Sequence, residues 1–207
     1  MGRAQRFKRR VGEPSLLQVF RGTNDPEFAQ LTLPGFDAAP HLTWPEREAM
    51  EELRRGPFAL HPHEVEGYAD EAHRAYRRRG VPLGWIHHEQ LARALGLVAL
   101  RDPTVATPIL DGSLVRLPPL SPRAMRFSVR HECAEHLLRG HPHATHADVQ
   151  ALGVALSVER AEVAAAVASV GRVRAVRLLA RAHRWVPWWE IRARISLADA
   201  CSHWLNP

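Results

Sequence analysis

The sequence reads RAMRFSVRHECAEHLL over residues 123–138, and this stretch carries most of what the chain tells about its chemistry. Residues four apart lie on the same face of an α-helix, so a helix here directs His131 and Glu135 toward one point. Zinc peptidases with the pattern H-E-x-x-H place two histidines at that spacing, and the glutamate after the first histidine acts as the general base. His131 and Glu132 match the pattern, whereas Glu135 holds the place of the second histidine and His136 follows one residue later. The stretch therefore predicts a metal-binding helix with an altered ligand set.

Histidines and carboxylates gather around this predicted helix. Five of the thirteen histidines lie between His131 and His146, and Asp148 follows directly. Imidazoles and carboxylates are the side chains that first-row divalent metals prefer as ligands. On a regular helix, His131 and His136 are rotated by about 140° from each other, so both bind one ion only if a π-bulge intervenes. The sequence leaves a further ligand open, and the candidates are His136, His141, His143 and His146.

The same stretch resembles the signature of the ImmA/IrrE metallopeptidase family, which reads R-x-x-R-F-[ST]-[LIV]-A-H-E-L-G-H-x-L-L. Upstream, HEQLARALGLV at residues 88–98 resembles the family segment l-A-x-x-l-G-l-x-V. Downstream, DVQALGVAL at residues 148–156 is similar to the family helix E-A-N-x-F-A-A-x-L. The resemblance covers about residues 80–195, and no gap is needed across the motif.

The resemblance implies a particular site. The glutamate of the family helix is the third metal ligand, and Asp148 holds the matching place. By resemblance, His131, Glu135 and Asp148 are the ligands, with His136 as an alternative ligand, and Glu132 is the catalytic base. The implied ion is zinc, or another divalent metal such as manganese, because one imidazole with two carboxylates is less selective for zinc than two imidazoles with one carboxylate.

Two functions follow as expectations. The resemblance implies a metal-dependent endopeptidase that cleaves a helix-turn-helix transcriptional repressor, and so acts in stress response and transcription regulation. The alternative is a catalytically inactive pseudo-peptidase that binds a regulator or DNA, in which Glu132 and Glu135 merely pair with arginines such as Arg130 and Arg139. The carboxylate at position 135 motivates this alternative, together with the basic residues near the N-terminus and the tryptophans near the C-terminus.

Composition sets outer limits on these readings. The chain has 207 residues, of which 45% are hydrophobic and 24% charged, as in an ordinary soluble protein. No run approaches the roughly 18 apolar residues of a membrane span, and the basic residues 1–10 are not followed by the apolar stretch of a secretory signal. We therefore expect a cytoplasmic protein that does not enter a membrane. The net charge of +6 comes almost wholly from arginine, since Lys8 is the only lysine, and favours DNA as a partner only weakly.

The pattern along the chain predicts an α+β fold: a mostly helical, zincin-like metallopeptidase domain with a small β-hairpin or sheet before the metal-binding helix. Prolines interrupt residues 1–45, which we expect to be an irregular, flexible extension, and residues 46–207 form the domain. Asp111-Gly112 between apolar arms predicts the hairpin. Expected helices are 43–55, 64–79 on the surface, 88–95, 122–139, 146–168, 172–183 and one that begins near Pro187.

The last two expected helices, at about 172–200, allow two interpretations. Arginines on the second helix could make the pair a DNA-reading helix-turn-helix. The pair also resembles the C-terminal structural helices of ImmA/IrrE-like domains, and this explanation covers more of the chain. We expect Trp185, Trp188 and Trp189 to lie in the core or at a partner interface rather than to stack on bases.

Overall fold

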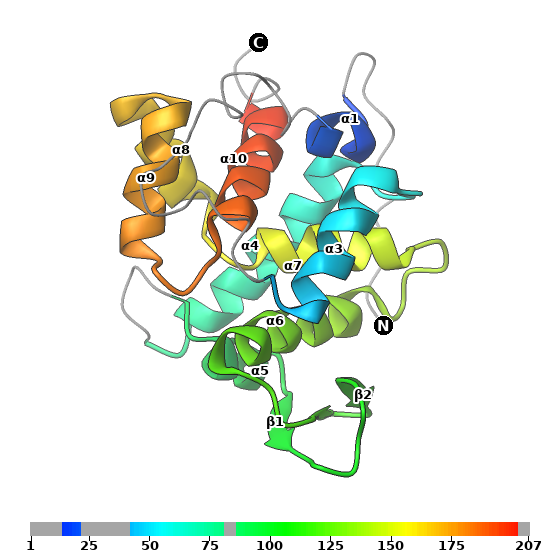
Figure 1. Ribbon diagram of the computed structural model, residues 1–207. Coiled ribbons are helices and arrows are strands. Elements are labelled where there is room, and N and C mark those ends of the chain that lie inside the picture. The colour runs from blue at the N-terminus through cyan, green and yellow to red at the C-terminus, as the bar shows by residue number, and fades with distance from the viewer. Residues whose placement is uncertain (1–13, 22–41, 81–85, 203–207) are drawn as a thin grey trace.

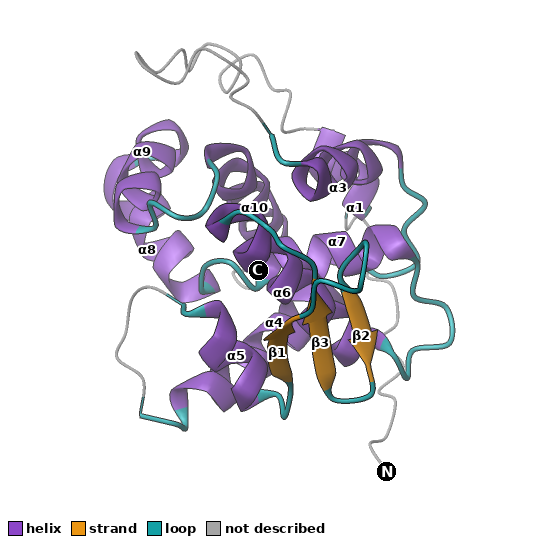
Figure 2. Ribbon diagram, turned by 60° about the horizontal axis from the view of Figure 1, so that its bottom comes forward, coloured by secondary structure: helices purple, strands orange, loops and turns teal. Residues whose placement is uncertain are grey.

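The computed structural model describes residues 14–21, 42–80 and 86–202, and there the chain is mostly helical with one small sheet (Figures 1 and 2). The α+β class predicted from the sequence is confirmed. The elements in chain order are α1 (Leu16–Arg21), α3 (Trp44–Arg55), α4 (Pro62–Arg77), α5 (His88–Ala94), β1 (Val98–Arg101), β2 (Ile109–Asp111), β3 (Leu114–Leu117), α6 (Pro122–Leu138), α7 (His146–Ala155), α8 (Arg160–Val170), α9 (Arg172–Ala182) and α10 (Trp188–Ser202).

Helix α6 begins where local chemistry predicts. The Ser121 hydroxyl accepts a hydrogen bond from the Ala124 amide at 3.3 Å, and Pro122 occupies the first turn, where a missing N–H costs nothing. The helix then runs without interruption to Leu138. It contacts α5, α7, α3 and two strands of the sheet, so most of its surface is buried. This regular, enclosed helix fixes the directions in which residues 131–136 point.

Helix α4 was expected on the surface; one of its faces is exposed, but the other is buried in the core. Val65, Ala69, Ala72 and Tyr76 are fully buried, at a spacing of i, i+4, i+7 and i+11 that forms one apolar stripe. The helix contacts α5, α7 and α10 (Figure 1). Its charged residues outnumber its large apolar ones, but two small alanines complete the stripe. Position on the helix, rather than the count of charges, decides its burial.

Residues 16–21 are another departure from the prediction. They were expected to belong to an irregular extension, but they form α1, whose Leu16, Val19 and Phe20 are buried against α3 and α10. The prediction that the rest of residues 1–45 is irregular concerns mainly residues 1–13 and 22–41, which lie outside the described residues.

The sheet is small and mixed, with strand order β1-β3-β2 (Figure 2). Strand β3 pairs parallel with β1 and antiparallel with β2. The predicted hairpin forms, but Asp111 pairs with Leu114, so the two-residue turn is Gly112-Ser113. Gly112 has φ +62°, a value that glycine adopts without strain. Strand β2 is an edge of the sheet and contacts α6.

The expected helix over residues 146–168 is divided into α7 and α8, so that prediction was wrong in extent. Neither proline nor glycine marks the break between Ala155 and Arg160. Instead the Val158 carbonyl accepts a hydrogen bond from Arg194 Nε at 2.7 Å, a contact across 36 residues that the local pattern does not reveal. The expected C-terminal helix pair is present as α9 and α10. In the part of the chain that is described, no helix has the length and apolar character needed to cross a bilayer.

Candidate metal centre

Helix α6 brings three potential ligands together. One ligand atom from each of His131, Glu132 and Glu135 lies within 4.8 Å of the other two. They stand at positions i, i+1 and i+4 of a regular helix, so His131 and Glu135 share a face as the spacing predicts. Among the described residues, no other group of three or more histidine, cysteine or acidic side chains meets the same distance.

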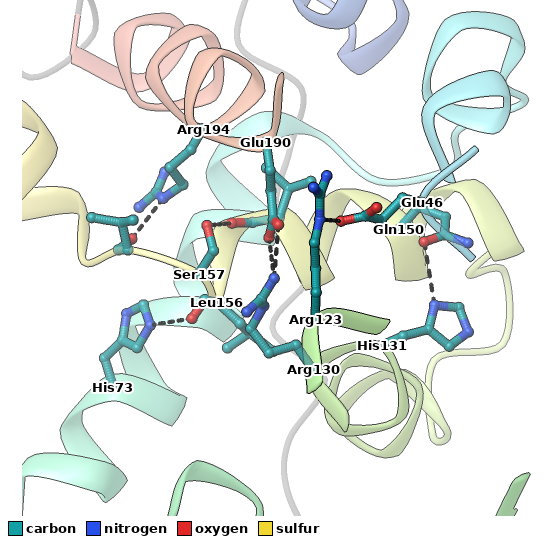
Figure 3. Close-up of polar contacts among 12 residues, drawn as sticks. Glu46, His73, Arg123, Arg130, His131, Gln150, Leu156, Ser157, Glu190 and Arg194 are labelled. Carbon is teal, nitrogen blue, oxygen red and sulfur yellow. Dashed lines mark hydrogen bonds and ion pairs between the residues drawn. The ribbon is translucent and has the colours of Figure 1, made fainter. Parts of the chain in front are cut away.

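His131 is held in one orientation by the neighbouring helix. Its Nδ1 atom lies 3.3 Å from Gln150 Oε1 on α7 (Figure 3). Gly153 of α7 lies against the backbone of His131, where an added Cβ would make an ordinary contact at 3.8 Å from the His131 Cα atom. Burial, followed by the nearby charge of His146, lowers the pKa of His131 to about 4. The imidazole is therefore neutral near pH 7, which is the form that binds metals.

Glu132 is buried beside a second carboxyl group. Burial, and then the charge and hydrogen bond of Glu135, raise the pKa of Glu132 to about 7. Its Oε2 atom accepts no hydrogen bond within the described structure. A carboxyl group whose pKa lies near the working pH suits proton transfer.

Asp148, the third ligand implied by the resemblance, lies elsewhere. It is fully buried, and its carboxylate accepts hydrogen bonds from the amides of Ala59, Leu60 and Thr145 at 2.8–3.2 Å and from the Thr145 hydroxyl at 2.8 Å. Asp148 is the third residue of α7 and forms a capping box with Thr145, so its side chain turns back toward the start of its own helix. The structure does not bring it to His131, Glu132 and Glu135.

Four further histidines were candidates for an additional ligand, and they lie in different places. His136 is not part of the cluster, since α6 contains no π-bulge and a regular helix rotates position 136 by about 140° from position 131. His141 and His143 contact each other edge to face, with ring centroids 6.4 Å apart. His146, at the start of α7, faces His131: the two Nε2 atoms are 3.3 Å apart. Of the histidines that the sequence left open, the structure brings this one to the cluster.

The arginines beside the cluster have partners elsewhere. Arg130 forms an ion pair with Glu190 of α10, with Nη2 2.6 and 2.7 Å from the two carboxylate oxygens (Figure 3). Arg139 Nη2 donates to the Leu110 carbonyl at 3.3 Å. The pairing of Glu132 and Glu135 with these two arginines, which the sequence allowed, is not the arrangement found. Sequence reasoning also missed Glu190 and Gln150, and neither follows a motif that would have marked them.

A cleft of about 210 Å³ opens onto the cluster. Helix α3, the loop before β2, and helices α6 and α7 form its walls. Both apolar and hydrogen-bonding side chains line it: Trp44, Pro45, Glu48, Thr107, Pro108, Phe127, Ser128, His131, Glu132, His146 and Gln150. Two imidazoles and a buried carboxyl group thus stand in a concave site that can take a small segment of substrate.

We found no family model, no curated protein and no solved structure that matches this sequence.

Proposed function

We propose that this protein is a metal-dependent endopeptidase in which His131 and Glu135 hold a divalent cation and Glu132 is the catalytic base. One observation carries the proposal: three ligand atoms of these residues lie within 4.8 Å of one another, on the one helix whose sequence resembles the ImmA/IrrE signature. Zinc is the first choice of ion and manganese the second, because carboxylate ligands suit both.

The chemistry of the cluster fits a cation. Two carboxyl groups stand side by side, and the raised pKa of Glu132 reflects its burial first and then the charge of Glu135. A positive ion between the imidazole and the carboxylates would relieve both effects. The Gln150 side chain accepts at His131 Nδ1 and so leaves Nε2 with its lone pair, the usual arrangement around a metal-binding histidine.

The residues of the cluster have distinct roles in peptide hydrolysis. When bound, the cation supplies Lewis acidity toward a carbonyl group and toward water. Glu132 takes a proton from the attacking water and later gives it to the leaving amine. Trp44, Pro108 and Phe127 form the apolar part of the cleft lining beside the reacting groups.

An extended peptide is the substrate that the surroundings favour. Thr107 and Pro108 line the cleft and lead directly into β2, an edge strand of the sheet. An edge strand presents unpaired backbone groups, to which an extended segment can add as a further strand. The resemblance adds the proposal that this segment belongs to a helix-turn-helix repressor.

The test is cleavage of a mixed-sequence peptide library, and of purified helix-turn-helix repressors from the same genome, read by mass spectrometry with Zn²⁺ or Mn²⁺ present. Glu132→Gln should abolish cleavage while the circular dichroism spectrum and the metal content stay unchanged. Glu51→Gln is the matched control, because Glu51 is exposed and pairs with Arg55 on the outside of α3. Persistent cleavage by the Glu132→Gln variant would refute the mechanism.

A second candidate function is binding of DNA or of an acidic regulator without hydrolysis. Arg174, Arg177 and Arg181 are exposed on one face of α9, and Leu178 is exposed between them. A basic face of this kind favours polyanions. Fluorescence polarisation with a mixed-sequence DNA duplex tests it: binding should weaken steeply with salt and drop in Arg174→Ala/Arg177→Ala. The absence of binding at low salt would exclude DNA.

A further inference from the structure

Three helices meet at His146. It is the first residue of α7, it faces His131 of α6, and its Nδ1 atom lies 2.8 Å from the carboxylate of Glu52 on α3. The rings of His131 and His146 stand edge to face, with centroids 4.9 Å apart and planes at 70°. Two imidazole nitrogens thus point at the same space from different elements.

The outer contacts determine which nitrogen of each ring carries the proton. A carboxylate only accepts hydrogen bonds, so Glu52 places the proton of a neutral His146 on Nδ1. The amide oxygen of Gln150 does the same for His131. Each Nε2 atom is then left with a lone pair, and the two lone pairs face each other across 3.3 Å. This arrangement is repulsive unless a proton or a cation lies between the two nitrogens.

The separation of the nitrogens fits a metal ion. Two nitrogens that are each about 2.0–2.1 Å from a tetrahedral Zn²⁺ stand about 3.3–3.4 Å apart. Metal-binding histidines also donate their second N–H to a carboxylate or carbonyl group, as both of these rings do. A shared proton is the competing explanation, and it predicts no effect of His146 on metal affinity.

We infer that His146 is the third protein ligand of the metal centre and that Glu52 is the positioning residue that orients it. The inference rests on the proposed function, because it completes the site of His131 and Glu135. Asp148 cannot take this place, since amides and a hydroxyl group already occupy its carboxylate. The ligand set becomes two imidazoles and one carboxylate, which is well suited to zinc.

The cluster must close slightly when it binds an ion. His146 lies outside the group whose ligand atoms are all within 4.8 Å of one another. The long side chain of Glu135 is partly exposed, so it can rotate toward the two imidazoles without disturbing the core. Glu132 is buried and stays in place as the base.

The experiment is titration of the metal-free full chain with Zn²⁺ by calorimetry and with Co²⁺ by visible absorption, which reports the coordination of the ion. His146→Ala should weaken Zn²⁺ binding by more than the about 10–100-fold typical of an outer partner and should change the Co²⁺ spectrum. Glu52→Gln should weaken binding by about 10–100-fold with little change of the spectrum. His143→Ala and Glu51→Gln are the matched controls, a neighbouring exposed histidine and a neighbouring exposed glutamate, and both should bind as the wild type does.

The outcomes separate this inference from the proposed function. If the wild type and the His146→Ala variant bind Zn²⁺ equally while His131→Ala loses it, the metal centre stands and His146 is not a ligand. If the wild type binds no metal, both proposals fail. His146 is exposed at a helix start, so its replacement should leave the thermal unfolding midpoint nearly unchanged, and a loss of affinity then reports on the site.

Discussion

Arg130 and His131 are neighbours in the sequence, yet their side chains point to different sides of α6 and meet different partners (Figure 3). On the side of α10, the Arg130 guanidinium and the Glu190 carboxylate form a buried ion pair of opposite charges. On the side of the cleft, Glu132 stands beside Glu135 and His131 beside His146, so like groups face each other. A buried pair of opposite charges stabilises the folded state by itself. A cluster of carboxyl groups and imidazoles stabilises it only when a cation is bound among them. The comparison separates structural charges from functional ones.

The largest expected effect comes from breaking the complementary side. Glu190 is fully buried and Arg130 nearly so. We expect Glu190→Gln to destabilise the fold by about 3–5 kcal/mol, because it leaves a buried guanidinium without a counter-charge. Urea denaturation of the wild type, Glu190→Gln, Arg130→Met and the double variant Arg130→Met/Glu190→Leu measures it, and the double variant should recover much of the loss. Single variants that each cost under about 1 kcal/mol would show that this pair is not structural.

Asp148 should behave as a structural residue although the resemblance makes it a ligand. Asp148→Ala removes a capping box and leaves the buried Leu60 amide without its acceptor. We expect a loss of about 2–4 kcal/mol in the free energy of unfolding, from the cap and the unsatisfied donor together. The folded variant should still bind Zn²⁺ in calorimetry. A stable variant that no longer binds the ion would restore Asp148 as the ligand.

A metal ion bound at the cleft should increase the stability of the folded protein. A metal that binds only the folded state stabilises it by about 2.7 kcal/mol at a free concentration 100 times its Kd. The thermal midpoint should therefore rise with Zn²⁺ and fall again with a chelator. His131→Ala should remove this response, whereas His143→Ala should keep it. An equal rise in all three proteins would mean that the ion binds elsewhere.

The sequence predicts the part of the site that lies within α6, but not the part that depends on a second helix. The i, i+4 spacing of His131 and Glu135 is local, and α6 realises it. The identity of the third metal ligand depends on how α7 packs against α6. Residues 146 and 148 are rotated by about 200° from each other on a helix, so only one of them can face α6, and similarity of residue type favoured the wrong one. The Thr145-x-x-Asp148 capping box was a sequence signal that Asp148 turns back on its own helix.

In the fold, too, the features that depend on neighbouring residues could be predicted from the sequence. The start of α6, the hairpin and the C-terminal helix pair depend on caps, turns and periodicity within a few residues, and they were predicted. At the break between α7 and α8, the Val158 carbonyl accepts a hydrogen bond from Arg194, 36 residues away. The burial of the charged Glu66 within α4 also involves Arg194, which pairs with its carboxylate from 128 residues away. Contacts across such distances leave no local pattern.

The smallest expected effect concerns pH and His88, a buried residue at the start of α5. Burial, followed by the charges of His87, Arg130 and Arg126, lowers the pKa of His88 to about 3. In the unfolded chain its pKa is about 6.5. A lowered pKa means that the contribution of His88 to stability is fully present above pH 6.5 and is lost progressively as the pH falls toward 3. In urea denaturation, His88→Leu should change stability little at pH 7, but between pH 7 and 5 it should lose about 1–2 kcal/mol less than the wild type. His143→Ala, which removes an exposed histidine, should follow the wild type. If His88→Leu loses as much stability as the wild type between pH 7 and 5, the acid sensitivity originates at another group, such as His131 on the cleft side, whose pKa burial also lowers.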